Sequence, residues 1–450
     1  MPKIFSYPNL SADFYFAHSP RDFVVSEIPL YEFSGSGEHQ ILQIRKKGLS
    51  TFELVKVLSA YIACPAKSIG YAGLKDKNAT TTQYLSIPKI YFKQKDIQSC
   101  FEAISKQHDI KLLSATLHNN KIKIGHLKGN RFFIRLKKVT PINAKKIESS
   151  LKIMQQFGFA NFFGFQRFGL SGENYKLGFD LANADLASSG FARGGFERWG
   201  FARSDLKGED KEEVKGDFAL SPHKPKIQKK MPKNKKIRDF LRSSLQSYLF
   251  NEWLCVRLLL GRFGEFGFGE FIEAIRESKE QKHAGQSYIE QESQSSKLDF
   301  LYTLQNKAFG NLLSLSRQNL REIYESLQHQ NMPFGLLNGD ICCHYPYGRF
   351  FVLERVDSIQ IDRFQAGEFA PTGVLNGENL KRATDIAHLL ELPFLEVDCR
   401  SGGSRRYAWV WASECESSYK ESKAQMELHF SLPSGAYATT MLEQIAGREL

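Results

Sequence analysis

Apolar positions in the first 90 residues predict strands that alternate with one helix. Asp22–Ile28 and Ile41–Ile44 are rich in the β-branched and apolar residues that favour strands. Ser50-Thr51-Phe52-Glu53 has the spacing of a capping box and is expected to open a helix that Pro65 ends. One face of this helix carries the apolar side chains Leu54, Val57, Leu58 and Tyr61. This order of elements favours a mixed α+β domain.

Later segments extend the same pattern. Lys121–Gly125 alternates like a half-buried strand, and Pro141 is expected to open a helix. The apolar face of that helix consists of Ile147, Leu151 and Met154. Phe240–Leu254 has the periodicity of an amphipathic helix that packs in a core. Strands near the end of the chain are indicated by Trp409, Trp411, Leu428 and Phe430.

One stretch, Ile69–Ser86, combines a short apolar strand, a polar loop and a second strand. The loop contains a single carboxylate, Asp76, between Lys75 and Lys77. Nearby positive charge favours the ionised form of an aspartate, and an ionised carboxylate can attack carbon without a helper base. The residues alone leave a second interpretation open, in which Asp76 is a turn residue between two solvated lysines.

Length and charge narrow the class of protein. A chain of 450 residues with 42% hydrophobic residues can hold two or more domains with packed cores. The net charge of +12 predicts attraction to a polyanion such as RNA, DNA or a membrane surface, although a generally basic proteome would give the same value. The chain shows no basic-then-apolar leader and no run of 18 apolar residues, so we expect a soluble cytoplasmic protein with no membrane partner.

The cysteine pattern argues against disulfides and metals. Seven cysteines at scattered positions favour reduced, mostly buried thiols. Cys342-Cys343-His344 is the only local cluster in the sequence, and adjacent cysteines rarely share one tetrahedral metal. Dinucleotide-binding, phosphate-loop and zinc-protease motifs do not occur, so the sequence implies no metal and no small-molecule cofactor.

Several strings resemble one known family. Gly73-Leu74-Lys75-Asp76-Lys77-Asn78-Ala79-Thr80 resembles the nucleophile loop of the tRNA pseudouridine synthase D (TruD) family. Gly129-Asn130-Arg131-Phe132 is similar to its Gly-Asn-x-Phe motif, and Asn161–Gly169 to its Asn-x-Phe-Gly-x-Gln-Arg-Phe-Gly signature. Gln246–Asn251 and Leu432–Thr439 resemble two further family segments. We therefore identify the chain, on resemblance, as a member of this family.

The resemblance implies a set of site residues. Asp76 would be the nucleophile, Phe23 would be turned toward the target uridine, and Tyr437 would line the active site. Asn130 would read the uracil edge and Phe132 would stack on the base. Each has a plainer alternative: core packing for the two phenylalanines, a Gly-Asn turn for Asn130, and packing for Tyr437.

One departure from the family pattern concerns the partner of the nucleophile. Family members often carry a lysine shortly before the first strand, where this chain has Ala17 beside His18. Either His18 or a lysine from elsewhere can then pair with Asp76. A second open choice concerns Gln166 and Arg167, which either contact RNA backbone or anchor a domain junction.

The resemblance also implies a domain plan. A pseudouridine synthase catalytic core of the α+β class would comprise residues 1–157 and 404–450, with an inserted α/β TRUD domain over 158–403. Residues 184–236 match no family segment. Their composition is typical of a mobile basic insertion, and the alternative is an arm that contacts phosphates.

The function that follows is isomerisation of a tRNA uridine, by resemblance uridine-13 of the D-arm, to pseudouridine. The partner would be tRNA, no cofactor is implied, and we expect a monomer. A non-catalytic RNA-binding or RNA-chaperone protein would explain the charge and the aromatic residues equally well, but it would not require Asp76 with Asn130. A metal-dependent nuclease is disfavoured, because the sequence offers no paired carboxylates or histidine cluster.

Overall fold

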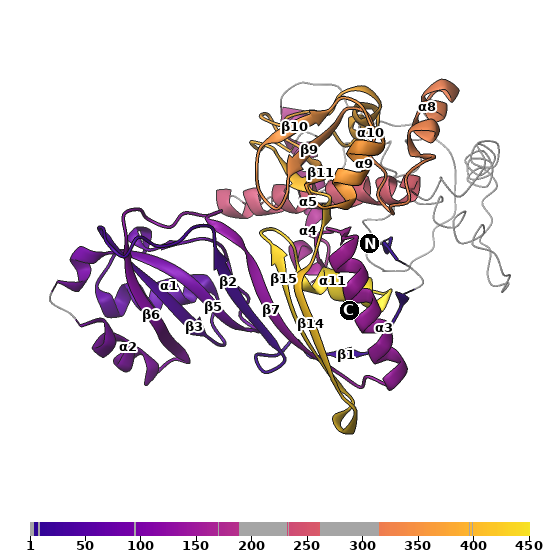
Figure 1. The fold of residues 1–450 in the computed structure, drawn as a ribbon. Helices are drawn as coiled ribbons and strands as arrows, with labels where there is room; N and C mark the ends of the chain where they lie inside the picture. The colour runs from indigo at the N-terminus through magenta and orange to yellow at the C-terminus, as the bar shows by residue number, and fades with distance from the viewer. Residues whose placement is uncertain are drawn as a thin grey trace, which may run out of the picture.

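The computed structural model describes residues 4–7, 10–93, 96–169, 171–188, 232, 234–261, 315–395, 397 and 399–450. In this part of the chain, strands form a nine-stranded sheet, a four-stranded sheet and a two-stranded pair. Figure 1 shows the large sheet extending away from a second unit, in which α5 (Lys235–Gly261) lies beneath the smaller sheet.

The nine-stranded sheet has the order β14-β15-β7-β2-β5-β3-β6, with β1 on β7 and β4 on β5. β2 and β5 run parallel, and the other pairs in this sheet are antiparallel. The strands are β1 (Tyr15–Phe16), β2 (Phe23–Pro29), β3 (His39–Lys46), β4 (Gly70–Tyr71), β5 (Thr80–Pro88), β6 (Ile110–His118), β7 (Leu127–Lys137), β14 (Ser413–Lys420) and β15 (Gln425–Pro433).

Four helices cover one face of this sheet. Residues directly opposite each other on paired strands point to the same face, so the pairings Leu42↔Leu85, Val25↔Thr81, Val25↔Phe132 and Phe132↔Phe430 trace one face across the sheet. At one end the face packs on α1 (Thr51–Ile62) and α2 (Ile97–Ser105). At the other end it packs on α3 (Pro141–Gln156) and α11 (Ala438–Ala446).

A polar band separates these two apolar clusters. On the same face, between them, lie the buried side chains of Glu27, Thr81 and Gln83 and the half-buried Asn130. Buried polar groups cost free energy unless they are bonded. A band of them in the middle of a sheet therefore marks a place that is not built for packing alone.

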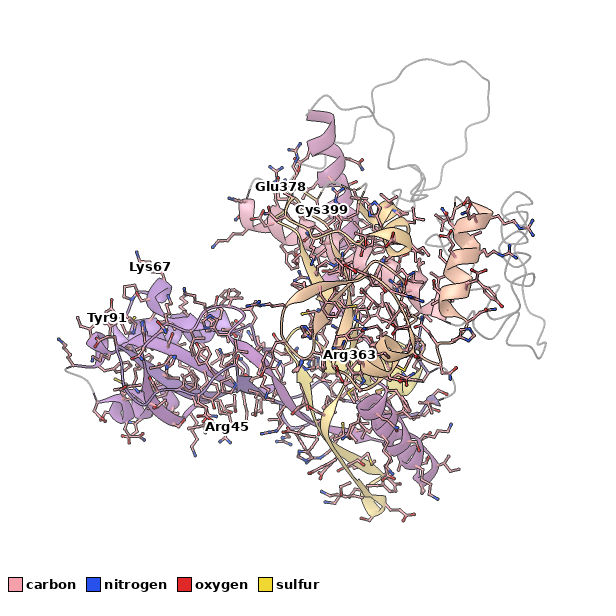
Figure 2. The ribbon with its side chains drawn as sticks, turned by 45° about the horizontal axis from the view of Figure 1, so that its top comes forward. Arg45, Lys67, Tyr91, Arg363, Glu378 and Cys399 are labelled. Carbon is pink, nitrogen blue, oxygen red and sulfur yellow. The ribbon has the colours of Figure 1, made fainter. Side chains whose placement is uncertain are left out.

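The second unit surrounds α5. Its sheet has the order β10-β9-β11-β12, and α5 packs against β11 and α4. The elements are α4 (Asn174–Ser188), α8 (Arg317–Leu327), β9 (Asp340–His344), β10 (Phe350–Leu353), α9 (Ser358–Gln365), β11 (Phe369–Leu375), α10 (Asp385–Leu395) and β12 (Ser404–Tyr407). Figure 2 shows Arg363, Glu378 and Cys399 in this unit, well away from Lys67 and Tyr91 in the unit of the large sheet.

Most of the predicted elements form, with three differences. The capping box at Ser50 is confirmed, but α1 ends at Ile62, before Pro65, because Ala63 adopts the left-handed conformation. α5 is buried on all sides from Ser244 to Leu260 rather than amphipathic, because α4, α10 and β11 pack around it; its predicted core role is confirmed.

The strand predicted at Lys121–Gly125 is wrong. The segment is irregular, with Ile122 buried and Ile124 77% exposed. The Ile122 backbone N–H donates to the side-chain hydroxyl of Ser86 instead of to a strand partner, so the alternation of this segment reflects docking on β5.

The two-stranded pair joins the two units. β8 (Phe159–Ala160) pairs with β13 (Trp409–Val410), where the chain leaves the first unit and returns to it. β12 lies just after the predicted boundary at 403, yet it pairs with β11 of the second sheet. The division at 157/158 and 403/404 stays a prediction. Most of the predicted insertion 184–236 lies outside the described residues, as does the polar segment 276–298.

The remaining sequence expectations concern thiols and the membrane. All seven cysteines lie in the described part of the chain, where no disulfide joins them, and five of them are buried, as the sequence predicts for mostly buried thiols. Among the described residues, no helix has the length and apolar character needed to cross a membrane.

Candidate active site

The loop that carries Asp76 connects β4 to β5 and is fixed by polar contacts. The Lys75 ammonium forms a buried ion pair with Glu27 of β2, with Nζ 2.8 Å from Oε1. The Lys75 backbone N–H donates to the Thr51 hydroxyl at 2.9 Å, and Nζ of Lys46 donates to the backbone carbonyl of Asp76 at 3.3 Å. Since β2, β3 and α1 all hold it, this loop presents Asp76 in a defined position.

The Asp76 carboxylate is one quarter exposed and has three polar neighbours. Nε2 of His18 lies 2.9 Å from Oδ2, and the backbone N–H of Asn78 donates to Oδ1 at 2.8 Å. Burial raises the pKa of Asp76, but hydrogen bonds from His18, Asn78 and Gln166, with the charge of His18, outweigh it and leave the pKa below its usual range. The carboxylate is therefore ionised at neutral pH.

The lysines beside Asp76 in the sequence form their ion pairs elsewhere. Lys75 pairs with Glu27, and Lys77 pairs with Glu53 at 2.9 Å. The sequence argument expected an ionised carboxylate because of these neighbours. The direction of that expectation holds, but the contacts come from His18, Asn78 and Gln166. Of the two candidates for the partner of Asp76, the structure places His18 there.

Asn130 lies in the polar band, opposite Glu27 across the β2–β7 pairing. Its Oδ1 is buried and has no hydrogen-bond partner in the described part of the chain. The turn considered as the plainer alternative for Gly129-Asn130 is wrong, because both residues lie inside β7, paired with β2 and β15. Gly129 is needed there because a Cβ would lie 2.4 Å from the carbonyl oxygen of Leu432.

Phe23 and Phe132 are buried, with 6% and 5% of their surfaces exposed. Their rings lie parallel, with centroids 6.2 Å apart, and the Phe132 ring also stacks on that of Phe430, with centroids 5.4 Å apart. The Phe23 ring also contacts His18, with centroids 5.1 Å apart. The two rings form an aromatic wall, and His18 packs against one of them, Phe23. Their contact with a base stays a prediction.

Tyr437 caps α11 in a cluster around Arg406 of β12. The guanidinium of Arg406 lies 3.9 Å from the ring centroid of Phe163 and 5.5 Å from that of Tyr437. It donates to the carbonyl of Gly435 at 2.6 Å and to the side-chain oxygen of Asn161 at 2.9 Å. Burial lowers the pKa of Arg406 to about 10, so it stays protonated at neutral pH. This cation therefore fixes the segment that holds Tyr437.

Of the two roles considered for the signature at Asn161–Gly169, the contacts of Arg167 favour anchoring of the junction, and contact with RNA backbone stays a prediction. Arg167 anchors the junction, donating to Ser247 of α5 at 3.0 Å and contacting Ser243. Gln166, by contrast, lies near Asp76 and helps to lower the pKa of its carboxyl, so it brings the junction to the candidate nucleophile. Asn251, in the Gln246–Asn251 motif, holds the same segment through two hydrogen bonds to the backbone of Phe163.

Sequence reasoning missed Lys46, Glu27 and Arg406. Lys46 is fully buried, and desolvation lowers its pKa to about 8. Glu27 could have been noticed, because it is a charged residue at a position of the predicted strand Asp22–Ile28 where the alternation calls for an apolar side chain. No local sequence pattern distinguishes Lys46 or Arg406. Among the described residues, no group of three or more histidine, cysteine or acidic side chains is arranged to hold a metal ion.

Comparison with known proteins assigns the chain to a family. The family model described as tRNA pseudouridine synthase D (TruD) matches residues 15–189. A tRNA pseudouridine synthase D of Helicobacter hepaticus is 40% identical over 443 residues, which cover 98% of this chain and 95% of the relative. The chain belongs to the TruD family. A relative of the same name from Sulfurimonas denitrificans is 37% identical over the full length of both chains.

Structural comparison agrees with this assignment. A crystal structure described as a tRNA pseudouridine synthase D (TruD) of Methanosarcina mazei has a TM-score of 0.52 with 22% identity, covering 99% of this chain and 96% of that one. The predicted α+β fold is confirmed by this likeness. TruD proteins are isomerases, so family membership favours an enzyme over the non-catalytic RNA binder that the composition left open.

Proposed function

We propose that this TruD protein isomerises uridine-13 in the D-arm of tRNA to pseudouridine, with Asp76 as the nucleophile. The observation that carries the proposal is the environment of Asp76. Its carboxylate is accessible, ionised and held on a fixed loop, and it lies in contact with His18, which rests on the aromatic wall. An ionised carboxylate in a fixed position can form a transient covalent bond to carbon.

The reaction needs neither a redox partner nor an energy source. The bond from the ribose to N1 of uracil breaks, the base rotates, and a bond from the same ribose carbon to C5 forms. C5 loses its hydrogen as a proton and N1 gains a proton, so substrate and product have the same composition. The target nucleotide has to leave its stack to reach the site, as base-modifying enzymes generally require.

The surrounding residues have roles that fit this chemistry. Oδ1 of Asn130 is a buried acceptor without a partner among the described residues, and the N3–H of uracil is a donor. Phe23 and Phe132 are proposed to face the base, and Tyr437, positioned by Arg406, to close the site from the α11 side. His18 is proposed as the positioning residue that keeps Asp76 ionised and oriented. We further propose that the protein acts as a monomer in the cytoplasm.

The test is tritium release from tRNA that carries 5-tritiated uridine, since conversion at C5 frees the label. We expect release by the native protein and none by Asp76→Asn, with tRNA binding unchanged. Asp109→Asn is a matched control, because Asp109 is a well-exposed carboxylate paired with Lys47 on the surface. From a tRNA that has cytidine in place of uridine-13, we expect the native protein to release no tritium.

Two outcomes would contradict the proposal. Equal release by Asp76→Asn and native protein would remove Asp76 from the chemistry. Release that persists after replacement of uridine-13 would show that another uridine is the target.

A further inference from the structure

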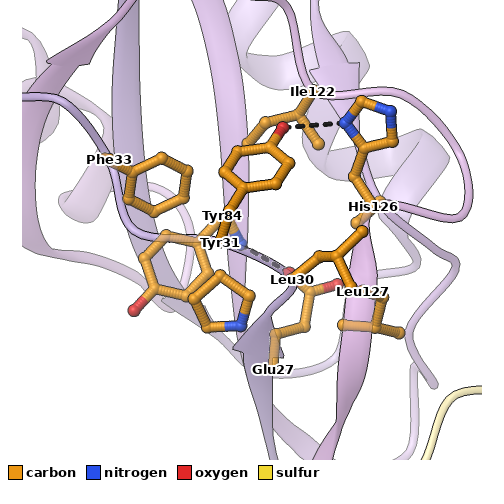
Figure 3. Close-up of a pocket in the computed structure, with 10 residues that line it drawn as sticks. Glu27, Leu30, Tyr31, Phe33, Tyr84, Ile122, His126 and Leu127 are labelled. Atoms are coloured by element: carbon orange, nitrogen blue, oxygen red, sulfur yellow. Dashed lines mark hydrogen bonds between the residues drawn. The ribbon is translucent and has the colours of Figure 1, made fainter. Parts of the chain in front are cut away.

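A groove lined by aromatic, histidine and lysine side chains lies where β2 separates from β5. Pairing between these strands stops at Ser26↔Thr82, which leaves an opening between them. The Glu27 carboxylate lies in this opening and accepts a hydrogen bond from the Tyr84 backbone N–H at 2.7 Å (Figure 3). Beyond this point lies a groove of about 370 Å³. Its lining includes Tyr31, His118, Lys121 and Lys123, together with one carboxylate, Glu32. Small-ligand pockets span roughly 300–1,000 Å³, so the groove has room for a nucleotide.

The rings of this groove are fixed in place by contacts within the protein. Tyr31 and His118 stack, with centroids 5.1 Å apart and an interplanar angle of 23°. The Tyr31 hydroxyl hydrogen-bonds Nδ1 of His126 at 2.7 Å, as Figure 3 shows, and Nδ1 of His118 accepts the backbone N–H of Ser34 at 3.2 Å. Rings that are already ordered lose little conformational entropy when a base stacks on them.

The groove is connected to the nucleophile loop through shared residues. Glu27, which lines the floor of the opening, forms the ion pair with Lys75, next to Asp76. Leu127, also in that floor, lies 3.8 Å from the Cβ position of Gly73 in the same loop. The groove and the Asp76 loop are therefore held together by Glu27 and Leu127, in the same part of the large sheet.

We propose that this groove is a second RNA subsite, which takes an unpaired base of the substrate tRNA other than the target uridine. The base stacks against the Tyr31 and His118 rings, and its phosphate lies near Lys121 and Lys123. Flat rings next to ammonium groups are the combination that binds single-stranded nucleotides without reading their sequence. The inference rests on the proposed function only in taking tRNA as the ligand.

The test compares two histidines that both lie beside aromatic rings. His118 lines the groove, whereas His429 lies beside Phe133, with centroids 5.0 Å apart, on the face of the sheet opposite Phe132. Loss of a stacked base weakens binding by about 5- to 150-fold. We expect His118→Ala to raise the Kd and the KM for tRNA by a factor in this range, with kcat at saturating tRNA unchanged. His429→Ala should leave all three unchanged.

Two further variants separate stacking from damage to the fold. His118→Phe keeps a flat ring and should restore most of the affinity, whereas Tyr31→Phe keeps its ring, loses only the hydroxyl contact, and should bind normally. If His118→Ala binds tRNA as tightly as His429→Ala does, the groove is not an RNA subsite. Absence of tritium release by the native protein would instead refute the proposed reaction, and the binding comparison would still decide this inference.

Discussion

Replacing His18 by alanine removes the side chain that most directly favours the ionised form of Asp76. Nε2 of His18 lies 2.9 Å from Oδ2 of Asp76, and both side chains are about one quarter exposed. The variant leaves the contacts of the loop itself untouched, because Lys75 and Lys46 hold the backbone and not the carboxylate. The change therefore acts on the charge and orientation of one group.

The expected effect follows from the strength of that contact. A hydrogen bond to a charged group contributes about 1.5–3 kcal/mol, which corresponds to roughly a 10- to 150-fold change in rate when the contact is needed in the transition state. Without His18, the pKa of Asp76 rises, because burial is then opposed by fewer groups, which include Asn78 and Gln166. A higher pKa leaves less carboxylate at a given low pH, so the acidic limb of the pH–rate profile moves to higher pH.

The assay is single-turnover tritium release as a function of pH. For His18→Ala we expect the rate constant to fall by about 10- to 150-fold at neutral pH, the acidic limb to move to higher pH, and tRNA affinity to stay within twofold. His18→Lys supplies a cationic side chain near the carboxylate and should recover most of the rate. His429→Ala is the control for loss of an exposed imidazole. An unchanged rate and pH profile in His18→Ala would refute the assigned role.

Two other predictions concern how the site is supported. Lys75→Met leaves the buried Glu27 carboxylate without its ion-pair partner and should lower the free energy of unfolding by about 3–5 kcal/mol, measured by urea denaturation. The double variant Lys75→Met/Glu27→Leu should recover much of this stability. A loss below about 1 kcal/mol in the single variant would contradict a stabilising role of the buried pair. Gly129→Ala puts a Cβ 2.4 Å from the Leu432 carbonyl oxygen, so β7 and β15 have to move apart at a cost of about 1–3 kcal/mol and Asn130 moves with them. We expect tritium release to fall in that variant, and full activity with native stability would show that the strands adapt freely.

The local sequence pattern was enough to predict those elements whose stabilising contacts lie between residues close together in the sequence. The capping box at Ser50 needs only side chains within one helical turn, and it forms as predicted. The strand, loop and strand around Asp76 likewise follow from a run of apolar and β-branched residues on either side of a polar loop. The motifs that identified the family are strings of this local kind, which is why they were readable without a structure.

Contacts between segments that are far apart in the sequence could not be predicted from local patterns. Gly129-Asn130 has the local chemistry of a turn, but β2 and β15 pair on either side of it and keep it extended. The alternation at Lys121–Gly125 suggested a strand, but a hydrogen bond from Ile122 to Ser86 satisfies its backbone instead. In both cases a partner from another part of the chain decides the conformation.

The sequence by itself determined the α+β class, the identity of the candidate nucleophile and the family to which the chain belongs. Only the tertiary structure decided which groups surround Asp76: it turns Lys75 away to Glu27, brings His18 from before the first long strand, and adds Gln166 from the junction of the two units. The physical reason is that a charge interacts with what is near in space, and burial strengthens that interaction whatever the separation along the chain.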